Sequence, residues 1–170
     1  MNHLLIHNDS AGAGAALRQR RALLLGGMAT AAALAGLRPS PTQAAAPLIE
    51  VWKSPSCGCC KDWMAHLQQH GFELKAHDSG NTDVRARLGM PLALGSCHTA
   101  TVAGYAIEGH VPAREIQRLL KERPAAVGLS VPAMPVGSPG MDGPEYGGRK
   151  DRYEVLLVAR DGSHRVYQAY

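Results

Sequence analysis

The amino-acid sequence predicts an α/β fold in which helices flank a β-sheet and a β-hairpin is added at the C-terminal end. Short apolar runs of strand length alternate with longer segments whose apolar residues recur every three or four positions. Glycine and proline separate these segments. Residues 47–170 number 124, which is the size of one small domain.

The first half of this domain predicts a strand, a helix, a strand and a short helix. Residues 48–52 form an apolar, partly β-branched run that is typical of a strand. Residues 58–70 place Trp63 and other apolar side chains on one helical stripe. A second strand is expected over residues 72–77, and a short helix over residues 81–89.

The second half begins with two strand-like runs, residues 99–103 and 105–108, which Gly104 joins as in a tight hairpin. A helix then opens at Pro112, because proline is well tolerated in the first turn, and it ends before Pro124. This order of elements is thioredoxin-like, and it places the start of the first helix at a cysteine-rich segment.

Residues 124–152 are expected to form a long loop, because they contain five prolines and six glycines and show no apolar periodicity. A loop of that length in a compact domain is either functional or disordered. The chain closes with two strand-like runs, residues 153–159 and 163–169. Between them Asp161-Gly162 is a strong hairpin signal.

Residues 1–46 predict a signal peptide rather than part of the fold. A polar start ends in Arg20-Arg21, and an apolar run over residues 22–37 leads to the small-residue stretch TQAAA. The run is shorter than the roughly 20 residues that span a bilayer, so cleavage is expected and no membrane anchor remains. The paired arginines resemble a twin-arginine export signal, with Sec export as the alternative. The domain is therefore expected in the periplasm.

The positive charge of the chain belongs largely to this segment. The whole chain has 18 basic and 14 acidic residues, of which four basic and one acidic lie in residues 1–46. Residues 47–170 keep 14 basic and 13 acidic residues, a net charge of +1. No nucleic-acid partner is therefore expected.

The segment SPSCGCCKDW contains three of the four cysteines, Cys57, Cys59 and Cys60. At the N-terminus of a helix, free backbone amides and the helix dipole favour thiolate, which is both a nucleophile and a metal ligand. On a regular helix Cys59 points about 160° away from Cys57, so the three sulfur atoms converge only if Cys57 precedes the first turn. A dithiol oxidoreductase has no use for the middle cysteine.

Cys97 and His98 lie just before the predicted third strand, in the sequence SCHT. In thioredoxin-like proteins this junction faces the cysteine motif and carries a cis-proline. Here a thiol and an imidazole replace the proline, so both are candidate ligands facing the cluster. Met134 and Met141 lie in the long loop, which could cover the site. Thiolate, thioether and imidazole together favour copper(I), and bridging thiolates permit more than one copper ion.

Four stretches resemble the exported metal-binding family, long called a domain of unknown function, that includes CopG-type copper-resistance proteins. They are CGCCKDWMAHL, LGSCHTATVAGYAIEGHVPAREIQRLL, GLSVPAMPVGSPGM and YEVLLVARDGSHRVYQAY. The resemblance implies a thioredoxin-like fold, a role in periplasmic copper homeostasis, and partners among copper-handling proteins. It also implies a ligand set, namely Cys57, Cys59, Cys60 and Cys97, with Met134, Met141, His98 and His110 as further candidates.

Two other functions remain open at this point. The Cys57/Cys60 pair is spaced as in a thiol oxidoreductase that acts on protein disulfides or on copper, so the sequence leaves enzymatic activity undecided. A structural module with fixed disulfides is the third reading, since four cysteines in an exported protein allow three pairings. Adjacent cysteines such as Cys59 and Cys60 rarely bridge each other, which weighs against it.

Overall fold

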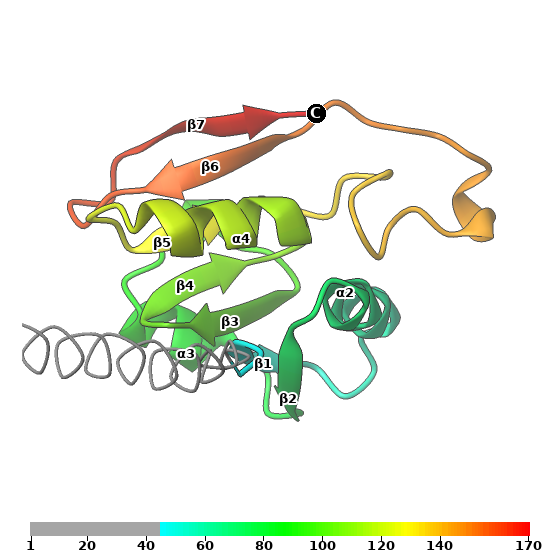
Figure 1. Ribbon diagram of the computed structural model, residues 1–170. Helices are drawn as coiled ribbons and strands as arrows, with labels where there is room; N and C mark the ends of the chain where they lie inside the picture. Colours follow the sequence, from blue (N-terminus) through cyan, green and yellow to red (C-terminus); the bar gives the residue numbers. More distant parts are fainter. Residues whose placement is uncertain (1–44) are drawn as a thin grey trace, which may run out of the picture. The chain divides into compact units, whose positions relative to one another are not determined.

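The computed structural model describes residues 45–170, which form a seven-stranded sheet with helices (Figure 1). The predicted signal peptide, residues 1–46, lies outside the described residues except for its last two. In the described part of the chain, no helix is both long enough and apolar enough to cross a membrane. The strands are β1 Leu48–Lys53, β2 Glu73–His77, β3 His98–Val102, β4 Tyr105–Glu108, β5 Gly128–Ser130, β6 Glu154–Val158 and β7 His164–Ala169. The helices are α2 Gly58–Gln69, α3 Thr82–Arg87 and α4 Ala113–Glu122, with short 3-10 turns at Leu92–Leu94 and Pro144–Tyr146.

The sheet has the order β2-β1-β3-β4-β5-β6-β7. Strands β1 and β2 pair in parallel across helix α2, while β3 pairs antiparallel with both β1 and β4. A parallel pair needs a crossover connection, and α2 supplies it. The first four strands with their helices reproduce the predicted thioredoxin-like arrangement, and the predicted α/β fold class is confirmed.

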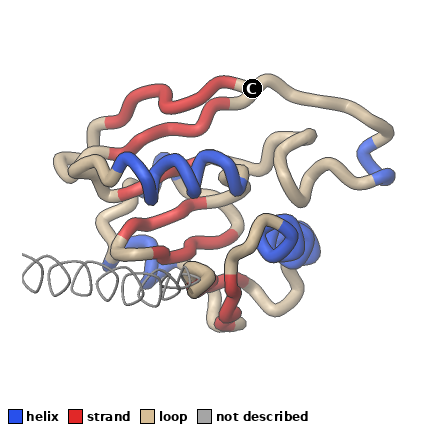
Figure 2. Tube along the Cα trace, in the orientation of Figure 1, coloured by secondary structure: helices blue, strands red, loops and turns tan. Residues whose placement is uncertain are grey.

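The prediction of a structureless loop over residues 124–152 was wrong at strand β5. This strand pairs parallel with β4 and antiparallel with β6, so it joins the C-terminal hairpin to the core sheet (Figures 1 and 2). All three of its residues are buried. A fully buried strand of three residues shows no apolar alternation, which is why periodicity missed it. The added hairpin of β6 and β7 is confirmed as an extension of the same sheet.

Two apolar clusters cover opposite faces of the sheet. Successive residues of β4 alternate between them, since Ala106 belongs to the smaller cluster and Ile107 to the larger. The larger cluster contains the buried apolar side chains of α4 and, from α2, Leu67 and Trp63, which is fully buried as predicted. The Trp63 indole N–H donates to the Val111 carbonyl over 2.9 Å. This packing fixes the N-terminal end of α2 beside the segments that flank β3 and α4.

Candidate metal centre

Helix α2 begins one residue after Cys57, which holds the N-cap position in an extended conformation. The amide of Cys57 donates to the Ser54 carbonyl over 3.1 Å, closing a turn before the helix. Cys59 and Cys60 therefore lie in the first turn while Cys57 precedes it. This is the arrangement that lets three closely spaced thiols point toward one place.

The four cysteine sulfur atoms lie within 4.8 Å of one another. Cys97, from the loop before β3, brings its Sγ to 3.6 Å from that of Cys60 and 3.9 Å from that of Cys59. The Sγ atoms of Cys57 and Cys59 are 3.6 Å apart. Segments 37 to 40 residues apart in the chain thus build one sulfur cluster, as the predicted topology requires.

Cys57 and Cys60 form a disulfide, while Cys59 and Cys97 are free thiols. The Cys57/Cys60 spacing is that of dithiols that open and close reversibly. A disulfide sulfur carries no thiolate charge and is a poor metal ligand. Two electrons must therefore enter this pair before all four sulfur atoms can act as thiolate ligands.

Two buried imidazoles flank the Cys97 thiol. The Sγ of Cys97 lies 3.1 Å from Nε2 of His110 and 3.4 Å from Nδ1 of His98. The Nδ1–H of His110 donates to the Pro139 carbonyl over 2.8 Å, so Nε2 holds its lone pair toward the thiol. Metal-ligating histidines commonly have their second nitrogen anchored in this way.

The buried environment keeps these side chains uncharged in the absence of metal. Burial lowers the pKa of His110, and burial followed by repulsion from His110 lowers the pKa of His98 well below its usual range. Burial, and then the neighbouring Cys59, raise the pKa of the Cys97 thiol to about 12. A metal that binds here finds neutral imidazoles and must displace the Cys97 proton.

His98 has an unsatisfied nitrogen. Its ring is fully buried and lies tilted against the Trp63 ring, with the ring centroids 4.2 Å apart, and its Nε2 has no hydrogen-bond partner in the described structure. Buried polar atoms without partners are rare in folded proteins. Cys97, His98 and His110 form a second set of donor atoms within 4.8 Å of one another, and this set shares Cys97 with the four-cysteine set.

The two loop methionines have different surroundings. The Sδ of Met134 lies 4.0 Å from Sγ of Cys59, and the residue Met134 is 48% exposed. The Met141 thioether instead accepts a hydrogen bond from the Tyr146 hydroxyl over 3.3 Å. The structure therefore brings Met134 to the sulfur cluster and directs Met141 toward Tyr146.

Residues 131–143, which we call the strap, pack on the first turns of α2. A Cβ atom added at Gly140 would lie 2.6 Å from the Cys59 carbonyl oxygen and from the Trp63 amide nitrogen. The strap also contributes the Pro139 carbonyl that orients His110. Sequence reasoning missed this acceptor, because a backbone carbonyl leaves no side-chain signal.

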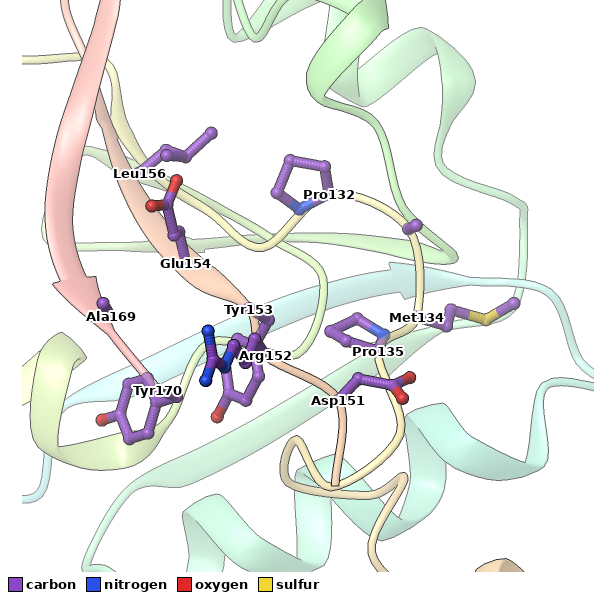
Figure 3. Close-up of a pocket in the computed structure, with 11 residues that line it drawn as sticks. Pro132, Met134, Pro135, Asp151, Arg152, Tyr153, Glu154, Leu156, Ala169 and Tyr170 are labelled. Carbon is purple, nitrogen blue, oxygen red and sulfur yellow. The ribbon is translucent and has the colours of Figure 1, made fainter. Parts of the chain in front are cut away.

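An open cavity of about 700 Å³ lies between the strap and the C-terminal hairpin, lined by residues of both. Figure 3 shows its lining, in which Pro132, Pro135, Tyr153 and Tyr170 surround the space. Met134 is the one lining residue that also contacts a cysteine of the cluster. The cavity therefore adjoins the sulfur cluster without containing it.

The fold and the site define a thioredoxin-like α/β protein with a buried cysteine–histidine cluster that could hold a metal ion. A family model described as a protein of unknown function, DUF411, matches residues 94–141. No curated protein matches the chain. A solved structure titled "Copper resistance protein copG- Form 2" is 44% identical, with a TM-score of 0.68, over 74% of this chain and 98% of its own. A second solved structure, "Copper resistance protein copG- Form 1", is 45% identical, with a TM-score of 0.67, over 72% of this chain and 96% of its own. The chain belongs to the family of CopG copper resistance proteins.

Proposed function

We propose that this protein is a periplasmic copper-binding protein that holds copper(I) in a thiolate-rich site and takes part in copper homeostasis or resistance. The observation that carries the proposal is the convergence of four cysteine sulfur atoms, two imidazoles and one thioether at the start of α2. Its solved relatives are named copper resistance proteins, which agrees with the proposal.

The donor set favours copper(I) over other metals. Thiolate and thioether are soft ligands, and imidazole completes a set that suits copper(I). Zinc also accepts cysteine and histidine but has little use for a thioether such as that of Met134. Calcium, magnesium and manganese prefer oxygen ligands, and the cluster offers none from a carboxylate.

We assign the ligands from the contacts around Cys97. Cys57, Cys59, Cys60 and Cys97 supply thiolates once the disulfide is reduced, and His98 and His110 supply nitrogen donors beside Cys97. Met134 supplies a thioether from the exposed side. Met141 is a ligand only after its side chain leaves Tyr146.

More than one copper ion fits this arrangement. Two donor sets, one of four cysteines and one of Cys97 with His98 and His110, share a single sulfur atom. A thiolate can bridge two soft metal ions, so Cys97 joins the two sets into one multinuclear site.

Residues 1–46 are proposed to direct export and to be removed, through the twin-arginine pathway or the Sec pathway. Copper enters as cargo, and other periplasmic copper-handling proteins are the proposed partners. The mass and the N-terminal sequence of protein recovered from a periplasmic fraction test this. Retention of residues 1–46 in the cytoplasmic fraction would argue against export.

A thiol or copper oxidoreductase is the second candidate, and the Cys57–Cys60 disulfide favours it. When this dithiol closes, two electrons and two protons pass to a protein disulfide, or two electrons reduce two copper(II) ions to copper(I) and the two protons go to solvent. The free Cys97 thiol lies 3.6 Å from the Cys60 sulfur atom. For an oxidoreductase, the Cys57–Cys60 disulfide is a step in the reaction. For a copper-binding protein, the same disulfide is the resting form of the metal site.

Anaerobic copper(I) titration of the reduced protein tests the proposal. Wild-type protein is expected to take up copper(I), and substitution of Cys57, Cys59, Cys60 or Cys97 by serine is expected to weaken binding in each case. The oxidoreductase makes a different prediction, because the Cys59→Ser variant keeps disulfide-exchange activity while Cys57→Ser and Cys60→Ser lose it. No copper(I) uptake, or saturation by zinc alone, would refute copper(I) binding.

A further inference from the structure

A buried polar network surrounds Ser96, the residue that precedes Cys97, and the metal site does not include it. Glu108, the last residue of β4, is fully buried. Its Oε1 accepts hydrogen bonds from the Ser96 amide over 2.6 Å and from Nε of Arg85 over 2.9 Å. Its Oε2 accepts the Thr99 hydroxyl over 2.6 Å. One carboxylate thus ties β4, α3 and both sides of Cys97 together.

The Ser96 carbonyl oxygen is also fixed by side-chain donors. It accepts Nη2 of Arg85 over 2.6 Å and the Asn81 side-chain amide over 3.2 Å. Both backbone polar groups of Ser96 are therefore fixed by side chains, and the Ser96 hydroxyl donates to the Ala133 carbonyl in the strap. A residue with this many partners leaves the following residue little freedom.

Of the four cysteine sulfur atoms, the Sγ of Cys97 has the most candidate ligand atoms close to it. It approaches Cys59, Cys60, His98 and His110 within 3.9 Å, and it belongs to both donor sets. Glu108 also lies two residues before His110, whose Nε2 is 3.1 Å from the Cys97 sulfur atom. The Glu108 carboxylate therefore ties the segment that carries Cys97 to the strand that leads to His110.

We propose that Glu108, with Arg85, is a positioning residue that holds the Cys97 loop in the metal-binding conformation. The proposal rests on the proposed copper function. The loop contains no proline next to Cys97, and residues 45–170 contain no cis peptide bond, so side-chain hydrogen bonds fix its backbone. A preorganised ligand loses less conformational freedom when the metal binds, which raises affinity.

A simple structural role is the alternative, because buried ion pairs also support folding. Glu115 provides the matched control. It is equally buried, and its Oε1 accepts Nε of Arg114 over 2.8 Å and the Tyr170 hydroxyl over 2.7 Å. These contacts tie α4 to the C-terminal end of the chain, and none of them involves the residues around Cys97. Loss of either glutamate removes a buried carboxylate, but only loss of Glu108 releases Ser96.

The test compares Glu108→Ala, Glu108→Gln and Glu115→Ala in the purified, reduced protein. Copper(I) affinity is measured by competition with a chromophoric chelator, at a temperature where unfolding curves show each variant folded. Glu108→Ala is expected to weaken binding about 10- to 100-fold, as loss of an orienting partner does in other metal sites. Glu108→Gln keeps an oxygen acceptor for the Ser96 amide, so it is expected to stay within a few-fold of wild type, as is Glu115→Ala.

Two further measurements keep the proposal falsifiable. In a Cys97→Ser background, Glu108→Ala is expected to add no further loss, because its effect acts through Cys97. If Glu108→Ala does not fold, Asn81→Ala removes one donor to the Ser96 carbonyl and is expected to weaken binding several-fold. Equal losses in Glu108→Ala and Glu115→Ala, or additive losses with Cys97→Ser, would overturn the positioning role.

The rate of Cys97 alkylation in metal-free reduced protein separates this proposal from the proposed function. Glu108→Ala is expected to alkylate Cys97 several-fold faster than wild type, because the released loop exposes the thiol. An unchanged rate would overturn the positioning role even if wild-type protein binds copper(I). Absence of copper(I) binding in wild-type protein, with a faster rate in the variant, would refute the copper function alone.

Discussion

Replacing Gly140 by alanine tests whether the strap controls the metal site. Gly140 has a φ of +83°, a left-handed conformation that costs an alanine about 1–3 kcal/mol. The new Cβ would also lie 2.6 Å from the Cys59 carbonyl oxygen and the Trp63 amide nitrogen. Both atoms belong to the first turns of α2, where Trp63 is fully buried, so the strap is the part that must move.

The size of this movement follows from the contact distances. Ordinary van der Waals contact begins near 3.4 Å, so the strap must retreat by about 0.8 Å at Gly140. The adjacent Pro139 carbonyl accepts the His110 Nδ1–H over 2.8 Å, and a shift of that size removes a normal hydrogen bond. His110 then loses the partner that orients its Nε2 toward Cys97. We expect copper(I) affinity to fall about 10- to 100-fold.

Gly147→Ala is the matched control for this prediction. Gly147 lies in the same long loop with a φ of +63°, but a Cβ atom there meets nothing within 4 Å. Both variants carry the backbone strain, and only Gly140→Ala displaces the strap. Urea unfolding measures the shared loss of stability, and chelator competition measures the copper(I) affinity. Equal affinities in the two variants would refute the role of the strap.

Two more predictions follow from single contacts. Met134→Leu removes the thioether that lies 4.0 Å from Cys59 and is expected to weaken copper(I) binding several-fold in a titration. Met141→Leu is expected to bind copper(I) like wild type, because the Met141 thioether contacts Tyr146. A loss of affinity in Met141→Leu but not in Met134→Leu would contradict the ligand assignment. Burial, and then His70, lower the pKa of His66, whose Nε2 accepts the Ala113 amide at the start of α4. Its protonation therefore favours the unfolded chain, so stability is full above the unfolded pKa of about 6.5 and falls as the pH drops below it. His66→Gln keeps an acceptor without titrating and should flatten this fall in urea unfolding between pH 7.5 and 5.5; an unchanged slope would contradict the assignment.

Local patterns in the sequence were sufficient to predict most of the fold. Apolar stripes and strand-length runs predicted α2, α4 and the strands β1, β3 and β4, because each buries one face or a short apolar run in the core. Alternation predicted β2 as well, although only its half-buried Leu74 packs against the core. Asp161-Gly162 predicted the hairpin of β6 and β7. Strand β5 was not predicted because it is three residues long and fully buried, so its sequence shows no apolar periodicity. Pairing with its neighbours β4 and β6 defines this strand.

The sequence by itself determined which donor groups this protein carries, since the crowding of Cys57, Cys59 and Cys60 at a helix start, with a distant Cys97, was enough to predict a soft-metal site. Only the tertiary structure decided which other side chains join them. It brought Met134 to Cys59 while Met141 turned to Tyr146, although both lie in the same strap. The reason is physical: a ligand set depends on angles and distances between segments, and these are set by long-range packing and by backbone groups such as the Pro139 carbonyl, which side-chain identity does not encode.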